Sequence, residues 1–156
     1  MRKLGAIDIG SNSIRLLVAE VEGGQIVESL KRLEMARIAE YKDSLNKLSE
    51  GAIKRCVLAL EKLIALAVEE RVEKLSIIAT SAVREAENKM QLIEKVKTEL
   101  GYDIEVVTGA GEAELGFLGV LGGIENQDEN ILVADVGGGS TEFIFGNASK
   151  IQYISS

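Results

Sequence analysis

The 156-residue sequence contains no histidine, proline or tryptophan, and it has a single cysteine. Without histidine, a Ser-His-Asp or Cys-His catalytic set is excluded, and a zinc site would have one thiol at most. A single cysteine cannot form an intramolecular disulfide. Any catalysis by this chain therefore uses carboxylates, hydroxyls, backbone amides, lysine, arginine or a bound metal ion.

Average usage would place roughly 8 prolines in a chain of this length, so turns must rely on glycine, Asn, Asp and Ser. The 46% hydrophobic and 28% charged residues are typical of a globular protein of one domain or slightly more. No uncharged stretch approaches the roughly 18 residues that a membrane span needs. We therefore expect a cytoplasmic protein that does not bind membranes, and a lone Cys56 suits that reducing compartment.

The net charge of −7 is concentrated in the last third of the chain. Residues 101–156 carry nine acidic groups and one lysine, whereas the first 100 residues are nearly neutral. Such a surface repels nucleic acid, so we expect no DNA or RNA partner. If the substrate is an anion, a divalent cation would neutralise both sides. The alternative is that the acidic residues only keep the protein soluble.

The hydropathy pattern predicts an α/β domain with the element order β-β-β-α-β-α-β-α. Residues 22–24 form a hairpin signal. Ser49 is the predicted N-cap of one helix, and Asn88 with Gln91 is the predicted capping box of another, which Gly101 ends. The predicted strands are 4–8, 14–21, 25–33, 75–79 and 104–107, and the third helix is predicted at 111–119.

A second β-β-β pattern begins at residue 131 and repeats the plan of the first. GAIDIGSNSIRLLVAEV and LVADVGGGSTEFIFG align Asp8 with Asp135 and Gly10 with Gly137, which predicts two related half-folds. The last 26 residues include no helix to cover their sheet and cannot bury a core alone, which favours a fragment of a longer protein. The predicted organisation is a first domain at 1–124, a linker at 125–130 and the beginning of a second domain at 131–156.

Both repeats contain a turn of small residues that suits an anion, because backbone N–H groups and hydroxyls converge there. The first turn is followed by a basic residue in the next strand, and the second contains three glycines, whose conformational entropy is costly to lose. Each turn alone is equally compatible with an ordinary hairpin, whereas two matching turns favour phosphate binding. The predicted phosphate ligands are Gly10, Ser11, Asn12, Ser13, Arg15, Gly137, Gly138, Gly139 and Ser140.

DIGSNSIRL and DVGGGSTE resemble the two phosphate-binding motifs of the Ppx/GppA phosphatases, which are exopolyphosphatases and guanosine pentaphosphate phosphohydrolases. ATSAVREAEN at 79–88 and TGAGEAELGFLGV at 108–120 are similar to two further segments of that family. The four motifs occur in the family's order and span essentially the whole chain. Their joint occurrence is more specific than any one of them.

The resemblance implies ribonuclease-H-like domains of the actin-like superfamily and a hydrolase that releases terminal phosphate by attack of water, usually with Mg²⁺. It implies Glu112 as the base, Asp135 and Glu142 as further catalytic carboxylates, and Arg84 as a phosphate ligand. Asp8, Asp135 and Glu142 are the implied metal ligands. Polyphosphate and guanosine penta- or tetraphosphate are the implied partners, and a homodimer is left open. Phosphoryl transfer needs mainly positioning and charge neutralisation, which agrees with these residue types.

Without the motif, Glu112 would be interpreted as a solvated residue in the first turn of a helix, where its charge suits the dipole. The family commonly has arginine where this chain has Glu114, and its Arg-Leu-Gly-Glu-Gly-Leu segment corresponds to residues 37–42, without either glycine. These departures suit a second hypothesis, a nucleotide- or polyphosphate-binding domain that has lost turnover. A sugar-kinase-like ATPase is a third and weaker one. Cys56 lies on an apolar helix stripe and is expected in the core.

Overall fold

The structure is a computed structural model that describes residues 1–40, 46–124 and 126–155. Contacts between residues divide the chain into two compact units, Met1–Val106 and Val107–Ser156. Unit 1 contains β1 (Arg2–Ile9), β2 (Ser13–Glu22), β3 (Gln25–Met35), α1 (Glu50–Glu69), β4 (Lys74–Ala79), α2 (Ser81–Arg84), α3 (Lys89–Leu100) and β5 (Glu105–Val106). Unit 2 contains α4 (Gly109–Leu121), β6 (Ile131–Val136), β7 (Thr141–Asn147) and β8 (Lys150–Ser155).

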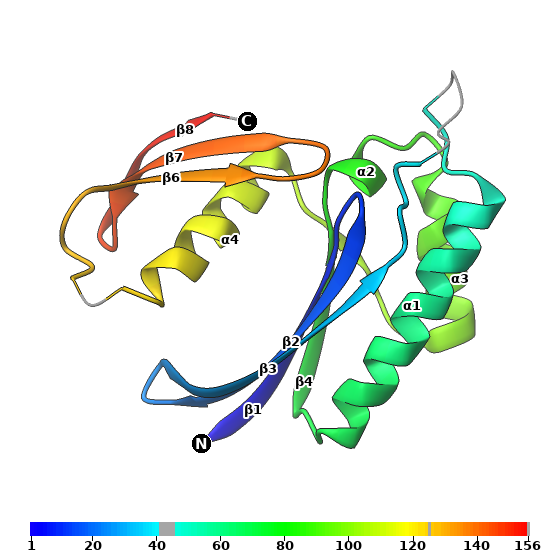
Figure 1. Cartoon of the computed structure of the whole chain (residues 1–156), viewed down its shortest axis with the longest axis horizontal. Helices are drawn as coiled ribbons and strands as arrows, with labels where there is room; N and C mark the ends of the chain where they lie inside the picture. The colour runs from blue at the N-terminus through cyan, green and yellow to red at the C-terminus, as the bar shows by residue number, and fades with distance from the viewer. Residues whose placement is uncertain (41–45, 125, 156) are drawn as a thin grey trace. The chain divides into compact units, whose positions relative to one another are not determined.

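Unit 1 is a five-stranded mixed sheet in the order β3-β2-β1-β4-β5, with α1 and α3 side by side on one face (Figure 1). Strand β2 runs antiparallel to both β1 and β3, whereas β1, β4 and β5 are parallel. The order of strands and helices that the sequence predicts is confirmed, with the short helix α2 as an addition. Parallel strands need a crossover, and α1 and α3 supply the two crossovers here.

Helix α1 begins where the sequence predicts, because Ser49 accepts a hydrogen bond from the Ala52 N–H at 3.1 Å. Its apolar stripe is buried against the sheet, and Cys56 is fully buried within it. Burial raises the pKa of the Cys56 thiol to about 12, so this side chain belongs to the core, as expected. Near the end of the helix Ala67 is buried, whereas Val68 is 62% exposed. With 3.6 residues per turn, the stripe continues from Ile64 by three positions rather than four.

The predicted hairpin turn and the predicted end of α3 are confirmed, whereas the predicted capping box at Asn88 is not. The hairpin between β2 and β3 turns through Gly23 and Gly24, both with positive φ, and Gly101 ends α3 in the left-handed conformation at φ +80°. The capping box predicted from Asn88 is wrong. Its carboxamide makes no N-cap bond; it accepts from the Leu48 N–H at 2.8 Å and donates to the Leu48 carbonyl at 3.0 Å. Asn88 is nevertheless the N-cap residue of α3, and its Nδ2 also donates to Gln91 Oε1 at 2.9 Å. The two residues therefore meet through their side chains, while the Asn88 oxygen accepts from a backbone 40 residues away.

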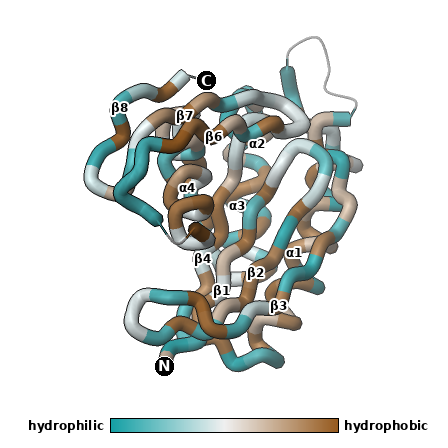
Figure 2. The backbone as a smooth tube through the Cα atoms, turned by 60° about the vertical axis from the view of Figure 1, so that its left-hand side comes forward, coloured by the Kyte–Doolittle hydropathy of each residue, from teal (hydrophilic) through white to brown (hydrophobic). Residues whose placement is uncertain are grey.

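Unit 2 is an antiparallel sheet in the order β6-β7-β8, covered on one face by α4. The apolar residues of α4, brown in Figure 2, form a stripe in which Ala113, Phe117 and Leu121 are buried together with Ile144 of β7. The sequence pattern predicts this helix in the first domain and the last three strands without a covering helix. In the structure the division falls at 106/107, because the stripe repeats every four residues and packs on β6–β8. Among the described helices, none is both long and apolar enough to cross a membrane.

Candidate active site

The first predicted phosphate loop is a tight turn between β1 and β2 that is closed by its own backbone. The Gly10 N–H donates to the Ser13 carbonyl at 3.1 Å. The Ser11 and Ser81 hydroxyls, both buried, hydrogen-bond each other at 3.2 Å. Asn12 at the tip is exposed. The loop is therefore anchored by Ser11, and its backbone and Asn12 are the groups that it presents to solvent.

Two other segments of unit 1 are fastened to this loop. The Asn12 carbonyl accepts from the Arg37 N–H at 2.8 Å, and the Ser11 carbonyl accepts from the Ala39 N–H at 3.1 Å. On the other side, the Thr80 hydroxyl donates to the Ile9 carbonyl at 3.3 Å. The structure thus brings the loop together with residues 36–39 and with the segment 79–88. These are three of the stretches that the resemblance singles out, and they are distant in sequence.

The charged candidates of unit 1 surround the same turn. Asp8 and Arg15 stand directly opposite each other in the β1–β2 register, so their side chains share one face of the sheet. Arg15 is exposed and one carboxylate oxygen of Asp8 is buried. Arg84 is the last residue of α2, and its carbonyl accepts from Lys89 Nζ at 3.1 Å. Their roles as phosphate or metal ligands remain predictions.

The segment at 37–42 is described only in part. Arg37 lies at φ +44°, and its guanidinium is 4.0 Å from the Glu40 carboxylate. Tyr41 and Lys42, which replace the second glycine and leucine of the family's segment, lie outside the described residues.

The second loop, between β6 and β7, repeats the geometry of the first. The Gly137 N–H donates to the Ser140 carbonyl at 3.0 Å, as Gly10 does to Ser13. A Cβ at Gly137 would lie 3.2 Å from the Ser140 carbonyl oxygen, and one at Gly10 would lie 3.1 Å from that of Ser13. A larger residue at either glycine would force the facing carbonyl to shift by a few tenths of an ångström. The sequence repeat is thus a repeat of backbone structure.

Three carboxylates are placed at one end of unit 2 by register and by helical spacing. Asp135 of β6 is directly opposite Glu142 of β7, on the face that carries Ile144 toward α4. Glu142 is only 1% exposed. A Cβ at Gly116 of α4 would lie 3.4 Å from Asp135 Oδ2, so the helix passes close to that carboxylate. Glu112 is one turn before Gly116 on the same side of α4. Asp135 and Glu142 are therefore paired across β6 and β7, and Glu112 lies one helical turn from the point where α4 comes close to Asp135.

Glu112 is oriented by the first turn of α4. The Thr108 hydroxyl accepts from the Gly111 N–H at 3.1 Å, and the Glu112 N–H donates to the Thr108 carbonyl at 2.8 Å. A carboxylate in the first helical turn is stabilised by the helix dipole. Glu114 lies on the exposed side of the same helix. The helix start therefore fixes the backbone that carries Glu112.

Replacing Thr108 with alanine is expected to destabilise α4, because the N-cap bond to Gly111 is lost. The expected cost is about 1 kcal/mol of unfolding free energy, and Thr108→Ser should recover most of it. Urea unfolding followed by circular dichroism measures both variants. Equal stability of the alanine variant and the wild type would contradict this role for Thr108.

The donor chemistry of this cluster suits a magnesium ion, which prefers carboxylate oxygens and retains bound water. Asp135 and Glu142 offer two such groups at neighbouring positions in unit 2. Among the described residues, no three acidic or cysteine side chains gather closely enough to hold a metal ion by themselves. A cation here would therefore take its remaining ligands from water or substrate.

Two residues of the site were given no role in the sequence analysis. Ser81 anchors the first loop, and its place inside ATSAVREAEN was the available signal. Gly116 marks the point where α4 comes close to Asp135, and a glycine inside a helix, four residues after Glu112, was the corresponding signal.

Comparison with known proteins agrees with this geometry. The chain superposes on an exopolyphosphatase from Cytophaga hutchinsonii with a TM-score of 0.90 and 33% identity, over 99% of this chain and 49% of that one. It is 33% identical to Exopolyphosphatase 2 of Mycobacterium tuberculosis, covering all of this chain and 52% of the relative. It is 39% identical to a bifunctional 3-dehydroquinate synthase/phosphatase of Fusobacterium nucleatum, over 94% of this chain and 23% of that protein.

The fold is therefore the ribonuclease-H-like fold of the actin-like superfamily, as the sequence predicts. A profile of the Ppx/GppA phosphatase family matches residues 17–156, and the chain belongs to that family. The chain spans about half the length of the exopolyphosphatases that it matches.

Proposed function

We propose that the protein hydrolyses the terminal phosphoanhydride bond of inorganic polyphosphate. The observation that carries the proposal is the grouping of Glu112, Asp135 and Glu142 at one end of unit 2, next to a turn that matches the turn in unit 1. Relatives named exopolyphosphatase support polyphosphate as the substrate class.

In the proposed reaction, Glu112 orients a water molecule and accepts its proton. The water oxygen bonds to the terminal phosphorus, the bridging P–O bond breaks, and the shortened chain leaves with the bridging oxygen. Without histidine in the chain, a carboxylate is the appropriate proton acceptor.

The phosphate charge needs donors and cations. The backbone N–H groups of the two loops, from Gly10 to Ser13 and from Gly137 to Ser140, are the proposed phosphate cradles. Arg15 and Arg84 are the proposed cationic ligands.

We further propose Mg²⁺ as the cofactor, with Asp135 and Glu142 of unit 2 as its ligands. Asp8 of β1 in unit 1 is separately proposed as a metal ligand. When bound, the ion would neutralise phosphate oxygens and polarise the attacked phosphorus. The acidic excess of the last third of the chain is consistent with a bound cation, because nine carboxylates would otherwise repel an anionic substrate.

The same cluster is also compatible with guanosine pentaphosphate, whose terminal anhydride has the same chemistry. The alternative of a binding domain without turnover is favoured by Glu114, which places a negative charge one half-turn from Glu112. A sugar-kinase-like ATPase is less supported, since the curated relatives named above are phosphatases.

The test is phosphate release by the full-length protein from long-chain polyphosphate and, in parallel, from guanosine pentaphosphate, with Mg²⁺ and with a chelator. The proposal expects magnesium-dependent release from polyphosphate. Release of phosphate only from guanosine pentaphosphate would identify the nucleotide, and not polyphosphate, as the substrate. No release with any divalent ion, combined with calorimetric binding of polyphosphate or guanosine tetraphosphate, would favour the binding domain instead.

A further inference from the structure

Arg55 of α1 donates two hydrogen bonds to the main chain of the segment that follows β3. Its Nε lies 2.9 Å from the Ala36 carbonyl oxygen, and its Nη2 lies 3.1 Å from that of Arg37. In the described part of the chain, Arg55 forms no ion pair with a carboxylate. The planar guanidinium presents its N–H donors in a fixed fork, so one arginine can hold two neighbouring carbonyl groups.

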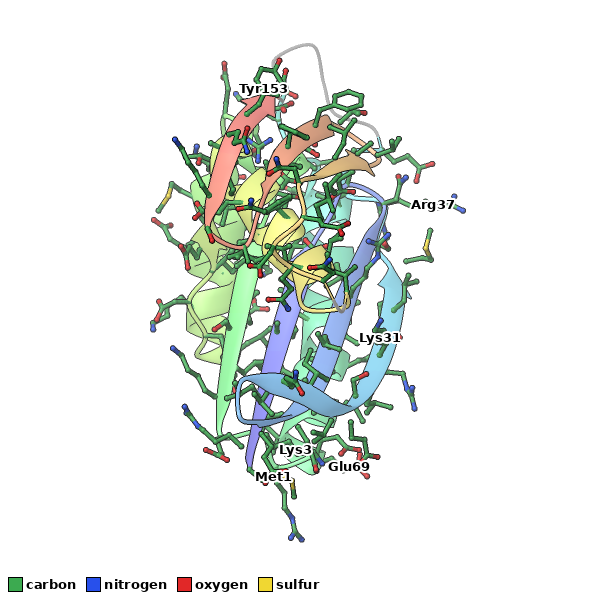
Figure 3. The ribbon with its side chains drawn as sticks, turned by 90° about the vertical axis from the view of Figure 1, so that its left-hand side faces the viewer. Met1, Lys3, Lys31, Arg37, Glu69 and Tyr153 are labelled. Atoms are coloured by element: carbon green, nitrogen blue, oxygen red, sulfur yellow. The ribbon has the colours of Figure 1, made fainter. Side chains whose placement is uncertain are left out.

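The same segment holds the first phosphate loop by its carbonyl groups. The N–H groups of Ala36 and Arg37 both donate to the Asn12 carbonyl, at 3.2 and 2.8 Å. The Ala39 N–H donates to the Ser11 carbonyl at 3.1 Å. Arg37 lies at φ +44°, a conformation that costs energy in a residue with a side chain, so the surrounding contacts must maintain it. Its exposed side chain, labelled in Figure 3, projects away from the ribbon, and the contacts to the loop come from its main chain.

The tied carbonyls determine where the N–H groups of the loop point. In a trans peptide the C=O and N–H groups point in opposite directions, so a carbonyl held on one side turns the next N–H to the other side. The Ser11 carbonyl shares its peptide unit with the Asn12 N–H, and the Asn12 carbonyl shares its unit with the Ser13 N–H. These two N–H groups therefore face away from residues 36–39. Successive N–H groups in a turn form a concave site for an anion.

We propose that Arg55 is a positioning residue for the first phosphate loop. By holding residues 36–39, it keeps the N–H groups of Asn12 and Ser13 directed at a bound phosphate. This inference rests on the proposed function, because it takes the loop as a phosphate cradle. The matching turn at residues 137–140 belongs to unit 2 and has no hydrogen bond to Arg55, so it serves as an internal control.

The contribution of Arg55 is one of geometry and not of charge. The side chains of Ala36 and Ile38 are buried, so the segment stays anchored in the core when Arg55 is removed, and only its peptide planes become free to turn. Lys54, the neighbouring residue on α1, carries the same charge but lines a groove with residues of α3. A substitution at each of these two positions therefore separates hydrogen bonding from charge.

Steady-state kinetics of the full-length protein with polyphosphate test the proposal. Arg55→Ala should raise KM by roughly tenfold, the effect of weakening a hydrogen bond to a charged group. The value of kcat should change only a few-fold, because Glu112 and the second loop are intact. Lys54→Ala is the matched control and should leave KM unchanged. Added methylguanidine should lower the KM of Arg55→Ala again, because it can take the place of the missing guanidinium.

Amide NMR during a titration with inorganic phosphate gives a readout that does not depend on turnover. In the wild type, the amide signals of both loops should shift. In Arg55→Ala the shifts of Asn12 and Ser13 should be largely lost, whereas those of Gly138 and Gly139 should remain. Circular dichroism checks that each variant is folded.

An unchanged KM of Arg55→Ala, together with an unchanged phosphate response of Asn12 and Ser13, would overturn the proposal. An equal rise of KM in Lys54→Ala would also overturn it, because charge would then be the cause. So would a failure of methylguanidine to lower the raised KM of Arg55→Ala. A wild-type protein in which neither loop responds to phosphate would contradict the proposed function itself, and this inference with it.

Discussion

Replacing Glu112 with glutamine is expected to lower kcat for phosphate release by about 10²–10⁴-fold, the usual contribution of a general base. Glutamine has the same shape and remains able to hold a water molecule, but it cannot accept the proton. KM should change little, because the phosphate loops are intact. Steady-state phosphate release from polyphosphate measures both constants.

The matched control is Glu114→Gln, which removes the same charge two residues further along α4, on the exposed side. It should leave kcat within a few-fold of the wild type. Equal losses in both variants would mean that charge, and not proton transfer at Glu112, governs the rate. Thermal melting of both variants verifies that α4 is intact.

The second large effect is on stability. Phe117→Ala is expected to lower the free energy of unfolding by about 3–5 kcal/mol, as replacements of fully buried aromatic residues by alanine usually do. Phe117 is 0% exposed and belongs to a core of four buried residues, with Ala113, Leu121 and Ile144. A core this small supplies little stability beyond what the fold of unit 2 needs. In the variant, β6–β8 should therefore lose protection from amide hydrogen exchange before the sheet of unit 1 does.

Leu118→Ala is the control, because Leu118 follows directly on the same helix and is 54% exposed. Its effect should be below about 0.5 kcal/mol. Hydrogen exchange read by mass spectrometry on peptides from β7 separates the two variants. Unchanged exchange in β7 of the Phe117 variant would show that α4 does not hold this sheet.

Much of unit 1 was predictable because its signals are local. Period-2 and period-3.6 hydrophobic patterns gave the strands and helices, and Ser49 and Gly101 marked helix ends through their own side-chain and backbone chemistry. The hydrogen bonds of Asn88 to the distant backbone of Leu48 were not predictable, and the capping box expected there does not form. A tertiary hydrogen bond of this kind leaves no trace in a local pattern.

In the site, too, local signals were predictive and tertiary packing was not. The two matching turns followed from the sequence repeat, and Glu112, Asp135 and Glu142 followed from the family motifs. The assignment of α4 to unit 2 could not be predicted in this way. The apolar stripe through Ala113 and Phe117 indicates an amphipathic helix, but it does not indicate which sheet the helix covers. The closeness of α4 to Asp135 at Gly116 is a consequence of that packing and was missed with it.

The most direct test of the account is polyphosphate hydrolysis with Mg²⁺ in water labelled with a heavy oxygen isotope, with released phosphate analysed by mass spectrometry. The account predicts that the wild-type protein releases orthophosphate carrying one solvent oxygen, and that Glu112→Gln releases almost none. Phosphate without solvent oxygen, or equal release by both proteins, would contradict attack of water on the terminal phosphorus with Glu112 as the base.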